Sequence, residues 1–320
     1  MIDMLNFVNR ATDQKGIVPL LSHICVHDGK LQASNSRMTI EGKCPQLAAH
    51  SFTVPAEKFI KAVERCKDVP KIERAANGTV KISSGRFRVT LPSLDAVNYP
   101  HQTFKPSEAV EIEAAAGFSL ALRKIAPFIS LDASRPWSLG ACLTKDYFYA
   151  TNNVTIVRTP VKWAGPVINL PGYIIQEILN IDEPILSIWA SKTSVSFEYE
   201  EGWLRAQLYT DAWPDISKMF EKEKEFEDVP DGLLSAIEQL IPFCPDVKFP
   251  SIHFKDGAIS TANGLQSAET GFDWKVQGIY RAEVLQLVLG VATRWSPHTY
   301  PKPVFFEGDG VEGLMVGAKR

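Results

Sequence analysis

The fold is decided by the stretch GWLRAQLYTDAWPDI, residues 202–216, because an earlier stretch, GRFRVTLPSLDAVNYP at residues 85–100, follows the same pattern. Each begins with Gly, a variable residue, an apolar residue and Arg, and each continues to an aromatic-Pro pair. Gly85 and Gly202 lie 117 positions apart, and the two aromatic-Pro pairs lie 114 positions apart. This nearly constant offset indicates an internal repeat.

A second pair of stretches lies upstream of the first at a similar offset: FTVPAEKFIKAV (residues 52–63) and VINLPGYIIQEIL (residues 167–179). Pro55 and Pro171 are 116 positions apart, and each opens a run of apolar residues with helical period. Proline suits the first turn of a helix, because its missing N–H would be unbonded there in any case. We therefore expect a helix to begin at each of these prolines.

A third, fainter copy follows near the C-terminal side. In GIYRAEVLQLVLGV, residues 278–291, Glu283 lies 226 positions after Glu57, and GLMVGAK at residues 313–319 starts 228 positions after Gly85. Both distances are close to twice the first offset. The chain is therefore interpreted as three copies of one unit.

The composition is that of an ordinary soluble globular protein of two or three domains, with 320 residues, 45% of them hydrophobic and 22% charged. No apolar run reaches the roughly 18 residues of a membrane span, and the start MIDMLNFVNR has no export pattern. The five cysteines are scattered without a CxxC pair, which is typical of reduced thiols. We expect a cytoplasmic protein that does not bind membranes.

The net charge of −3 argues against a protein whose whole surface binds nucleic acid, although a local basic surface is compatible with it. Turn signals between alternating segments predict tight hairpins. They are Asp28-Gly29, Asn77-Gly78, Asp256-Gly257, Asn263-Gly264 and Asp309-Gly310.

Six helical patterns alternate with these hairpins. Their apolar positions are Leu5, Val8 and Ala11; Phe59, Val63 and Cys66; Phe118, Leu122, Ile125 and Ile129; Ile174, Ile175, Ile178 and Leu179; Leu233, Leu234, Ile237 and Leu240; and Val284, Leu285, Val288 and Val291. Two helices and several short strands per unit predict an α+β fold with antiparallel sheet covered by helices on one face. We place the domains at residues 1–107, 108–219 and 220–320.

Four strings carry a resemblance to a known family: FTVPAEKF, VKISSGRFRVTLPSLDAVNYP, FYATNNVTIVRTPV and LYTDAWPDISKMF. The chain resembles the bacterial DNA polymerase III beta subunit, the sliding clamp, over most of its length and least in the third unit. The resemblance implies three repeated DNA-clamp domains, with two head-to-tail subunits closing as a ring around duplex DNA. Because this sequence is shorter than the usual bacterial member, a phage- or plasmid-encoded origin is a hypothesis.

Basic residues on the expected inner helices are the candidates for DNA binding. Lys58, Lys61 and Arg65 recur at helical spacing opposite an apolar face, which fits either DNA contact or an ordinary solvated helix face. Lys15 aligns with a DNA-contacting basic residue of the family. The full set is Arg10, Lys15, Lys58, Lys61, Arg65, Arg123 and Lys124.

The resemblance also implies a pocket for partner peptides between the second and third domains. Here the family's usual His and Arg are replaced, and its Met-Pro-Met ending reads Val-Gly-Ala, so we expect an altered preference. The alternative is that these are core and strand residues without a groove. The candidate residues are Thr151, Asn153, Val154, Thr155, Ile156, Pro214, Lys218, Met219, Leu314, Val316, Gly317 and Ala318.

For ring closure, the resemblance implies an edge strand in the first domain that meets a helix end in the third. Pairing edge strands across subunits would satisfy their open backbone groups. An ordinary sheet edge explains the two arginines equally well. The candidates are Arg86, Arg88, Val89 and Leu91 on one side and Phe243 and Cys244 on the other, with Glu269 as a counter-charge.

Other chemistry has weaker support. His23, Cys25 and His27 alternate on an expected strand and share a face that could bind zinc, but a fourth ligand is not visible. No catalytic motif is present, so we expect neither an enzyme nor a cofactor. The leading hypothesis is a processivity clamp whose partners are double-stranded DNA, a replicative DNA polymerase, a clamp loader and a second copy of the chain. The alternative is a clamp-fold interaction scaffold that does not close on DNA.

Overall fold

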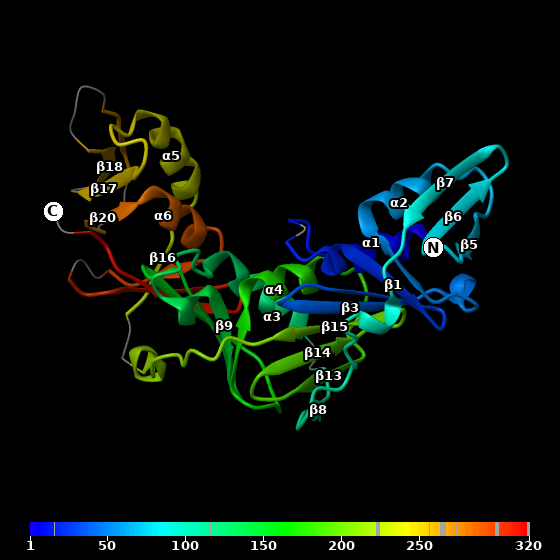
Figure 1. Ribbon diagram of the computed structural model, residues 1–320. Coiled ribbons are helices and arrows are strands. Elements are labelled where there is room, and N and C mark those ends of the chain that lie inside the picture. Colours follow the sequence, from blue (N-terminus) through cyan, green and yellow to red (C-terminus); the bar gives the residue numbers. More distant parts are fainter. Residues whose placement is uncertain are drawn as a thin grey trace. The chain divides into compact units, whose positions relative to one another are not determined.

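A computed structural model describes most of the chain (Figure 1). The hairpin signals at Asp256 and Asn263-Gly264, and the end of the third-copy string at Lys319, lie outside the described residues. Those described are residues 1–15, 17–114, 117–221, 225–255, 257–262, 267–272, 274, 276–297 and 301–318.

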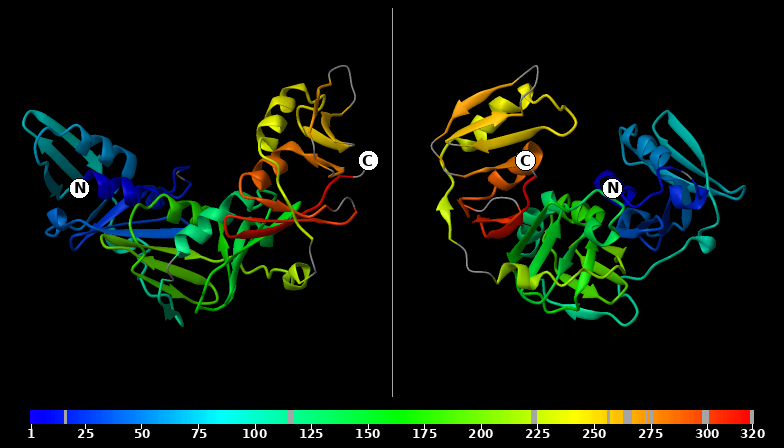
Figure 2. Two further views of the ribbon diagram at one scale, coloured as in Figure 1. Left: turned by 180° about the vertical axis from the view of Figure 1, so that it is seen from behind. Right: turned by 90° about the vertical axis from the view of Figure 1, so that its left-hand side faces the viewer.

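Within these ranges the chain forms six α-helices, two in each expected repeat, as the apolar periodicity predicts. They pack in pairs, α1 with α2, α3 with α4, and α5 with α6 (Figure 2). Their bounds are α1 Ile2–Asn9, α2 Ala56–Glu64, α3 Phe118–Ile125, α4 Gly172–Leu179, α5 Leu233–Leu240 and α6 Ala282–Leu289.

Helix α2 shows why these segments are helical. Phe59, Ile60 and Val63 are buried on one side, and Lys58 and Lys61 are exposed on the other. Such an apolar stripe is stabilised by packing against sheet and neighbouring helix more than by intrinsic propensity. The helices begin one residue later than we expect from the prolines. Pro55 and Pro171 are the N-cap residues and end the preceding strands, with extended ψ angles of 117° and 139°.

The first sheet has eight antiparallel strands in the order β4-β1-β2-β3-β15-β14-β13-β8. Strands of the first and second repeats meet where β3 pairs with β15, with Ile40 opposite Leu204 and both side chains buried. The bounds are β1 His23–His27, β2 Lys30–Ser34, β3 Met38–Lys43, β4 Phe52–Pro55, β8 Val110–Ile112, β13 Ser187–Ala190, β14 Ser194–Glu198 and β15 Gly202–Gln207.

The second sheet repeats this arrangement with the order β12-β9-β10-β11-β23-β22-β21-β16. Strands of the second and third repeats meet where β11 pairs with β23, with Ile156 opposite Leu314. The bounds are β9 Gly140–Leu143, β10 Tyr147–Thr151, β11 Thr155–Pro160, β12 Ile168–Pro171, β16 Glu227–Asp228, β21 Arg294–Trp295, β22 Val304–Gly308 and β23 Val311–Met315.

Two smaller sheets complete the described chain, one with the order β5-β6-β7 and the other with the order β19-β18-β17-β20. Asp28 and Asp309 adopt positive φ angles of 47° and 46° in the predicted Asp-Gly hairpin turns. The remaining bounds are β5 Lys71–Ala75, β6 Thr79–Ser84, β7 Phe87–Pro92, β17 Ser251–Lys255, β18 Ala258–Thr261, β19 Glu269–Gly271 and β20 Gly278–Arg281.

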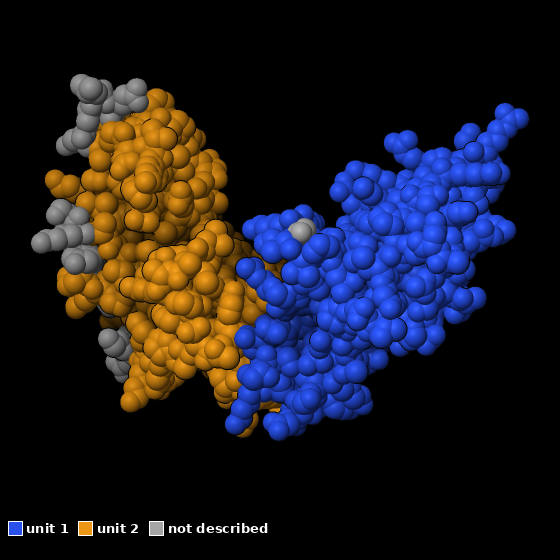
Figure 3. All heavy atoms as spheres, in the orientation of Figure 1, with its two compact units in different colours: residues 1–114, 182–208 blue, residues 115–181, 209–320 orange. Residues whose placement is uncertain are grey.

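The chain divides into two compact units, residues 1–114 with 182–208 and residues 115–181 with 209–320 (Figure 3). The middle repeat is shared between them, because strands β8 and β13 to β15 belong to the first sheet and strands β9 to β12 to the second. No described helix is long and apolar enough to cross a membrane.

Residues 99–105, which we call the strap, run across strands of both repeats within the first unit. Gln102 exchanges two hydrogen bonds of 3.0 Å with Gln32 on β2, and Arg205 on β15 donates to the Thr103 carbonyl at 3.0 Å. The Phe104 ring lies 6.5 Å from that of Trp189 and 6.2 Å from that of Trp203. The strap therefore fastens strands of the first repeat to strands of the second.

Truncating the central strap side chain should loosen this fastening. Phe104→Ala removes the aromatic contacts with Trp189 and Trp203, so we expect the first unit to lose about 1–3 kcal/mol of stability, which thermal unfolding will show as a lower midpoint. Val97→Ala, at a side chain that is 85% exposed, is the control and should leave the midpoint unchanged. Equal midpoints for both variants would contradict a bracing role for the strap.

Candidate functional site

The basic face of α2 lies in the first unit, and its geometry matches the expectation from sequence. Lys58, Lys61 and Arg65 are exposed, with Arg65 at the C-cap. Lys61 also bonds Glu57 one turn earlier at 2.5 Å, and this contact lowers the pKa of the Glu57 carboxyl. Two acids on the same helix, Glu57 and Glu64, moderate its positive charge. The face can therefore attract phosphate groups weakly rather than bind them tightly.

The other DNA-binding candidates differ in their surroundings. Arg10 is exposed at the C-cap of α1, and Lys15 is exposed in a turn where the Asp13 carboxylate accepts its backbone N–H at 3.0 Å. Arg123 on α3 is also exposed. Lys124, by contrast, has a side chain that is only 19% exposed.

The Lys124 ammonium group holds the hairpin turn between β22 and β23. It donates to the backbone carbonyl of Asp309 and lies 3.3 Å from the carboxylate of the same residue. Sequence reasoning could not find this contact, because the two residues are 185 positions apart. The contact ties α3 of the second repeat to a hairpin of the third.

The peptide-pocket candidates lie in the second unit, and three of them line one cavity. Lys218, Met219 and Leu314 surround a volume of about 270 Å³ together with Pro303 and Phe305. Sequence reasoning missed the last two. Phe305 lies opposite Leu314 on the β22–β23 hairpin, so the hairpin pattern was the signal that could have identified it.

The floor of this cavity is part of a small apolar core. Phe305 and Leu314 pack with Tyr149, Ile216 and Phe220 beneath it. Arg158 lies above the Tyr147 ring at 4.1 Å and the Phe220 ring at 4.4 Å, and its Nη2 bonds the Glu312 carboxylate at 2.7 Å. Because Arg158 and Glu312 are direct partners across β11 and β23, this pair stabilises the wall beside the cavity.

Five further candidates do not line the cavity but lie on or next to strands β10, β11 and β23. Val154 accepts the Val316 N–H at 3.1 Å, and Ile156 lies opposite Leu314 in the paired strands. Thr151 and Thr155 are buried, and the Thr151 hydroxyl donates to the Thr155 carbonyl at 2.8 Å. These contacts fix the tight turn between β10 and β11.

The last four candidates also lie outside the cavity lining. Pro214 is exposed beside Trp213, which packs on the apolar core. Asn153 bonds Ser130 from the turn, and Ala318 donates to the Ile279 carbonyl at 2.7 Å. Gly317 lies so close to Ile279 that an added Cβ would meet its carbonyl at 3.0 Å. The end of the described chain therefore lies against β20.

The subunit-interface candidates are found at two separate places. Among the strands that the structure describes, β7 pairs only with β6, so it is a sheet edge, and it exposes Arg88 and partly exposes Val89. Leu91 on the same strand is only 5% exposed. Arg86 is exposed in the turn before β7, and Glu269 is exposed on β19.

In the second unit, Phe243 is 49% exposed and Cys244 is buried. The Cys244 thiol lies 3.6 Å from the Ser251 carbonyl, and burial raises its pKa. An apolar side chain as exposed as Phe243 is the kind of group that another chain can cover.

The three residues considered for zinc have different partners. His23 Nδ1 lies 3.2 Å from the Thr53 hydroxyl, Cys25 Sγ lies 3.8 Å from His101 Nε2, and His27 Nε2 lies 3.0 Å from the Asp28 carboxylate. Burial raises the pKa of Cys25 to about 12, which keeps the thiol protonated. In the described ranges, no three His, Cys, Asp or Glu side chains are placed to hold a metal ion.

Burial of His23 should make stability depend on pH. Its side chain is 6% exposed, and desolvation lowers its pKa below the ordinary 6.5. As pH falls, His23 is therefore protonated in the unfolded chain before it is protonated in the folded protein. The stability that neutral His23 contributes is complete above about pH 6.5 and is lost as pH falls towards the lower folded-state pKa. His23→Asn should flatten this part of the thermal-unfolding profile, whereas parallel profiles for both proteins would contradict the assignment.

Comparisons with known proteins place this geometry in a known fold. Neither a protein-family model nor a curated protein sequence matches the chain. Among solved structures, the Bacillus subtilis DNA polymerase sliding clamp is similar with a TM-score of 0.84 and 17% identity, covering 100% of this chain and 97% of that one.

Two further structures give the same result. The Bartonella birtlesii sliding clamp, DNA polymerase III subunit beta, bound to griselimycin, has a TM-score of 0.83 and 16% identity, covering 100% of this chain and 97% of that one. The Helicobacter pylori beta clamp, bound to a DNA ligase peptide, has a TM-score of 0.81 and 18% identity, covering 99% and 97%. Over the residues that the structure describes, the chain has the fold of the DNA polymerase III beta subunit sliding clamps.

Proposed function

We propose that the protein is a DNA polymerase processivity factor, a sliding clamp that encircles duplex DNA as a head-to-tail ring of two chains. The observation that carries the proposal is the match of the whole chain to solved clamps. Fold alone does not determine function. The exposed cations of α2 and the apolar cavity beside β23 add chemistry that a clamp needs.

Weak phosphate attraction suits this function. A clamp has to remain on DNA while moving along it, so ring topology supplies retention, and tight phosphate binding or base recognition would oppose movement. The partners in this proposal are double-stranded DNA without sequence preference, a replicative polymerase and a clamp loader. No catalytic step is part of it.

A second candidate is a clamp-fold interaction scaffold that does not close on DNA. The absence of Lys and Arg from α4, α5 and α6 favours this candidate. The mass in solution separates the two. A ring needs two chains of 35.5 kDa, so light scattering across a dilution series should give about 71 kDa, twice that mass. A species that remains at 35.5 kDa at high concentration would favour the scaffold.

An edge-strand substitution tests the proposed interface. Val89→Asp places a charge on the open edge of β7, where the side chain is only partly buried. It should yield folded monomers of 35.5 kDa in place of dimers. Leu91 is unsuitable, because it is buried and a charge there would disturb the β6–β7 sheet. Val97→Asp, at an exposed position, is the control and should leave the dimer intact. If the Val89→Asp variant also remained a dimer, the interface would lie elsewhere.

The cavity lined by Met219 and Leu314 is proposed to receive an apolar side chain of a partner peptide. The ligase peptide of the Helicobacter pylori complex is the probe. Met219→Glu puts a charge at the cavity and should weaken peptide binding at least about tenfold, or about 1.4 kcal/mol, in fluorescence anisotropy. Val167→Glu, at an exposed position of the same unit, should have no effect. Equal affinities for the two variants would exclude this cavity as the peptide site.

A further inference from the structure

The charges of the six helices are distributed unevenly. Lys and Arg occur only in α2 and α3. Each of the other helices of the second unit contains one acid and no base: Glu177 in α4, Glu238 in α5 and Glu283 in α6. We call α2 and α3 the basic part and α4, α5 and α6 the acidic part.

The acidic part continues into the segment that leads to α5. Residues 225–247 contain no Lys or Arg, and all six acids in this range are exposed. The six are Glu225, Glu227, Asp228, Asp231, Glu238 and Asp246.

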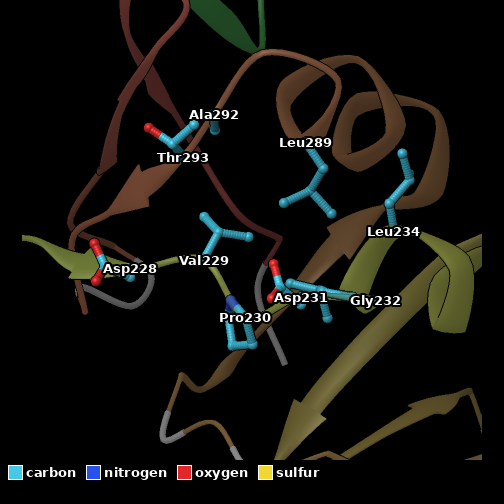
Figure 4. Close-up of a pocket in the computed structure, with 10 residues that line it drawn as sticks. Asp228, Val229, Pro230, Asp231, Gly232, Leu234, Leu289, Ala292 and Thr293 are labelled. Atoms are coloured by element: carbon cyan, nitrogen blue, oxygen red, sulfur yellow. The ribbon is translucent and has the colours of Figure 1, made fainter.

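Two of these acids line an open hollow beside the α5–α6 pair. Asp228 and Asp231 lie with Leu234, Leu289 and Thr293 around a volume of about 450 Å³ (Figure 4). Arg294 lies opposite Asp228 in the β16–β21 pair, but its guanidinium group bonds the Glu307 carboxylate at 2.6 Å. The negative charge at this end of the second unit is therefore only partly balanced.

The basic part is also smaller than the sequence indicates. Lys124 is held by Asp309, which leaves Arg123 as the exposed cation of α3. On α2, Lys61 is paired with Glu57. Lys58 and Arg65 on α2 and Arg123 on α3 thus make up most of the positive charge that these two helices expose.

We infer that Glu238 on α5 and Glu283 on α6 limit DNA affinity by repelling the phosphates of a bound duplex. This inference rests on the proposed function. Charges within a Debye length of roughly 8–10 Å interact at physiological salt, so an exposed acid opposes the binding of phosphates that pass within that distance. Such a limit keeps the bound ring mobile.

The test compares matched variants of the full chain, using a fluorescein-labelled duplex of about 30 base pairs at low salt, because weak phosphate binding is strongest there. The double variant Glu238→Gln and Glu283→Gln should tighten binding by about two- to fivefold. Lys58→Gln with Arg123→Gln should weaken binding and reduce the salt slope by up to about four, because a ring of two chains carries each substitution twice. Asp146→Asn, in the turn between β9 and β10, is the control for loss of a negative charge and should leave affinity unchanged.

The outcomes separate this inference from the function on which it rests. The inference is supported if the variant Glu238→Gln with Glu283→Gln binds DNA more tightly and Asp146→Asn does not. Unchanged binding by that variant, with weaker binding by the α2–α3 variant, overturns the inference and leaves the clamp function intact. Equal tightening by Asp146→Asn also overturns it, because the effect would then be one of net charge. Failure of the wild-type ring to remain on circular DNA would overturn the proposed function itself.

Discussion

The fold depends on strand pairing between repeats. Each repeat alone would leave an open sheet edge, with a row of backbone groups that need hydrogen-bond partners. Pairing of β3 with β15 and of β11 with β23 closes these edges and produces two sheets of eight strands from three repeats. The buried Ile40–Leu204 pair and the Ile156–Leu314 pair set the register of these joins. The helices and the peptide cavity are positioned by the sheets that result.

Each join is reinforced by contacts outside the strand pair. The strap fastens the first join through Gln102, Thr103 and Phe104. Lys124 and Arg158 fasten the second through the carboxylates of Asp309 and Glu312. Arg158 donates from Nε and Nη2 to one oxygen of Glu312, and a partly buried charged pair of this kind contributes more than an exposed ion pair. The cavity proposed for a partner peptide lies beside the second join, whose strands these contacts hold together.

The sequence predicted the helices, the hairpin turns and the α+β class, because these follow from local periodicity and from Asp-Gly pairs. The resemblance to sliding clamps, rather than a local pattern, grouped Met219 with Leu314, and the two residues line one cavity. Contacts made by tertiary packing could not be predicted, and the pairing of Lys124 with Asp309 is one example. Pro303 and Phe305 were missed in the cavity because the third copy is the faintest. The predicted domain boundaries remain predictions, and the sharing of the middle repeat between two compact units reflects the long sheets.

Retention on DNA tests the central claim most directly. The protein should be bound to a nicked circular plasmid, washed at moderate salt, and compared with the same plasmid after it has been cut once. A ring held by topology should stay on the circle and slide off the linear ends, because its phosphate contacts are weak. Equal loss from both forms, or equal retention on both, would contradict a chain that encircles DNA.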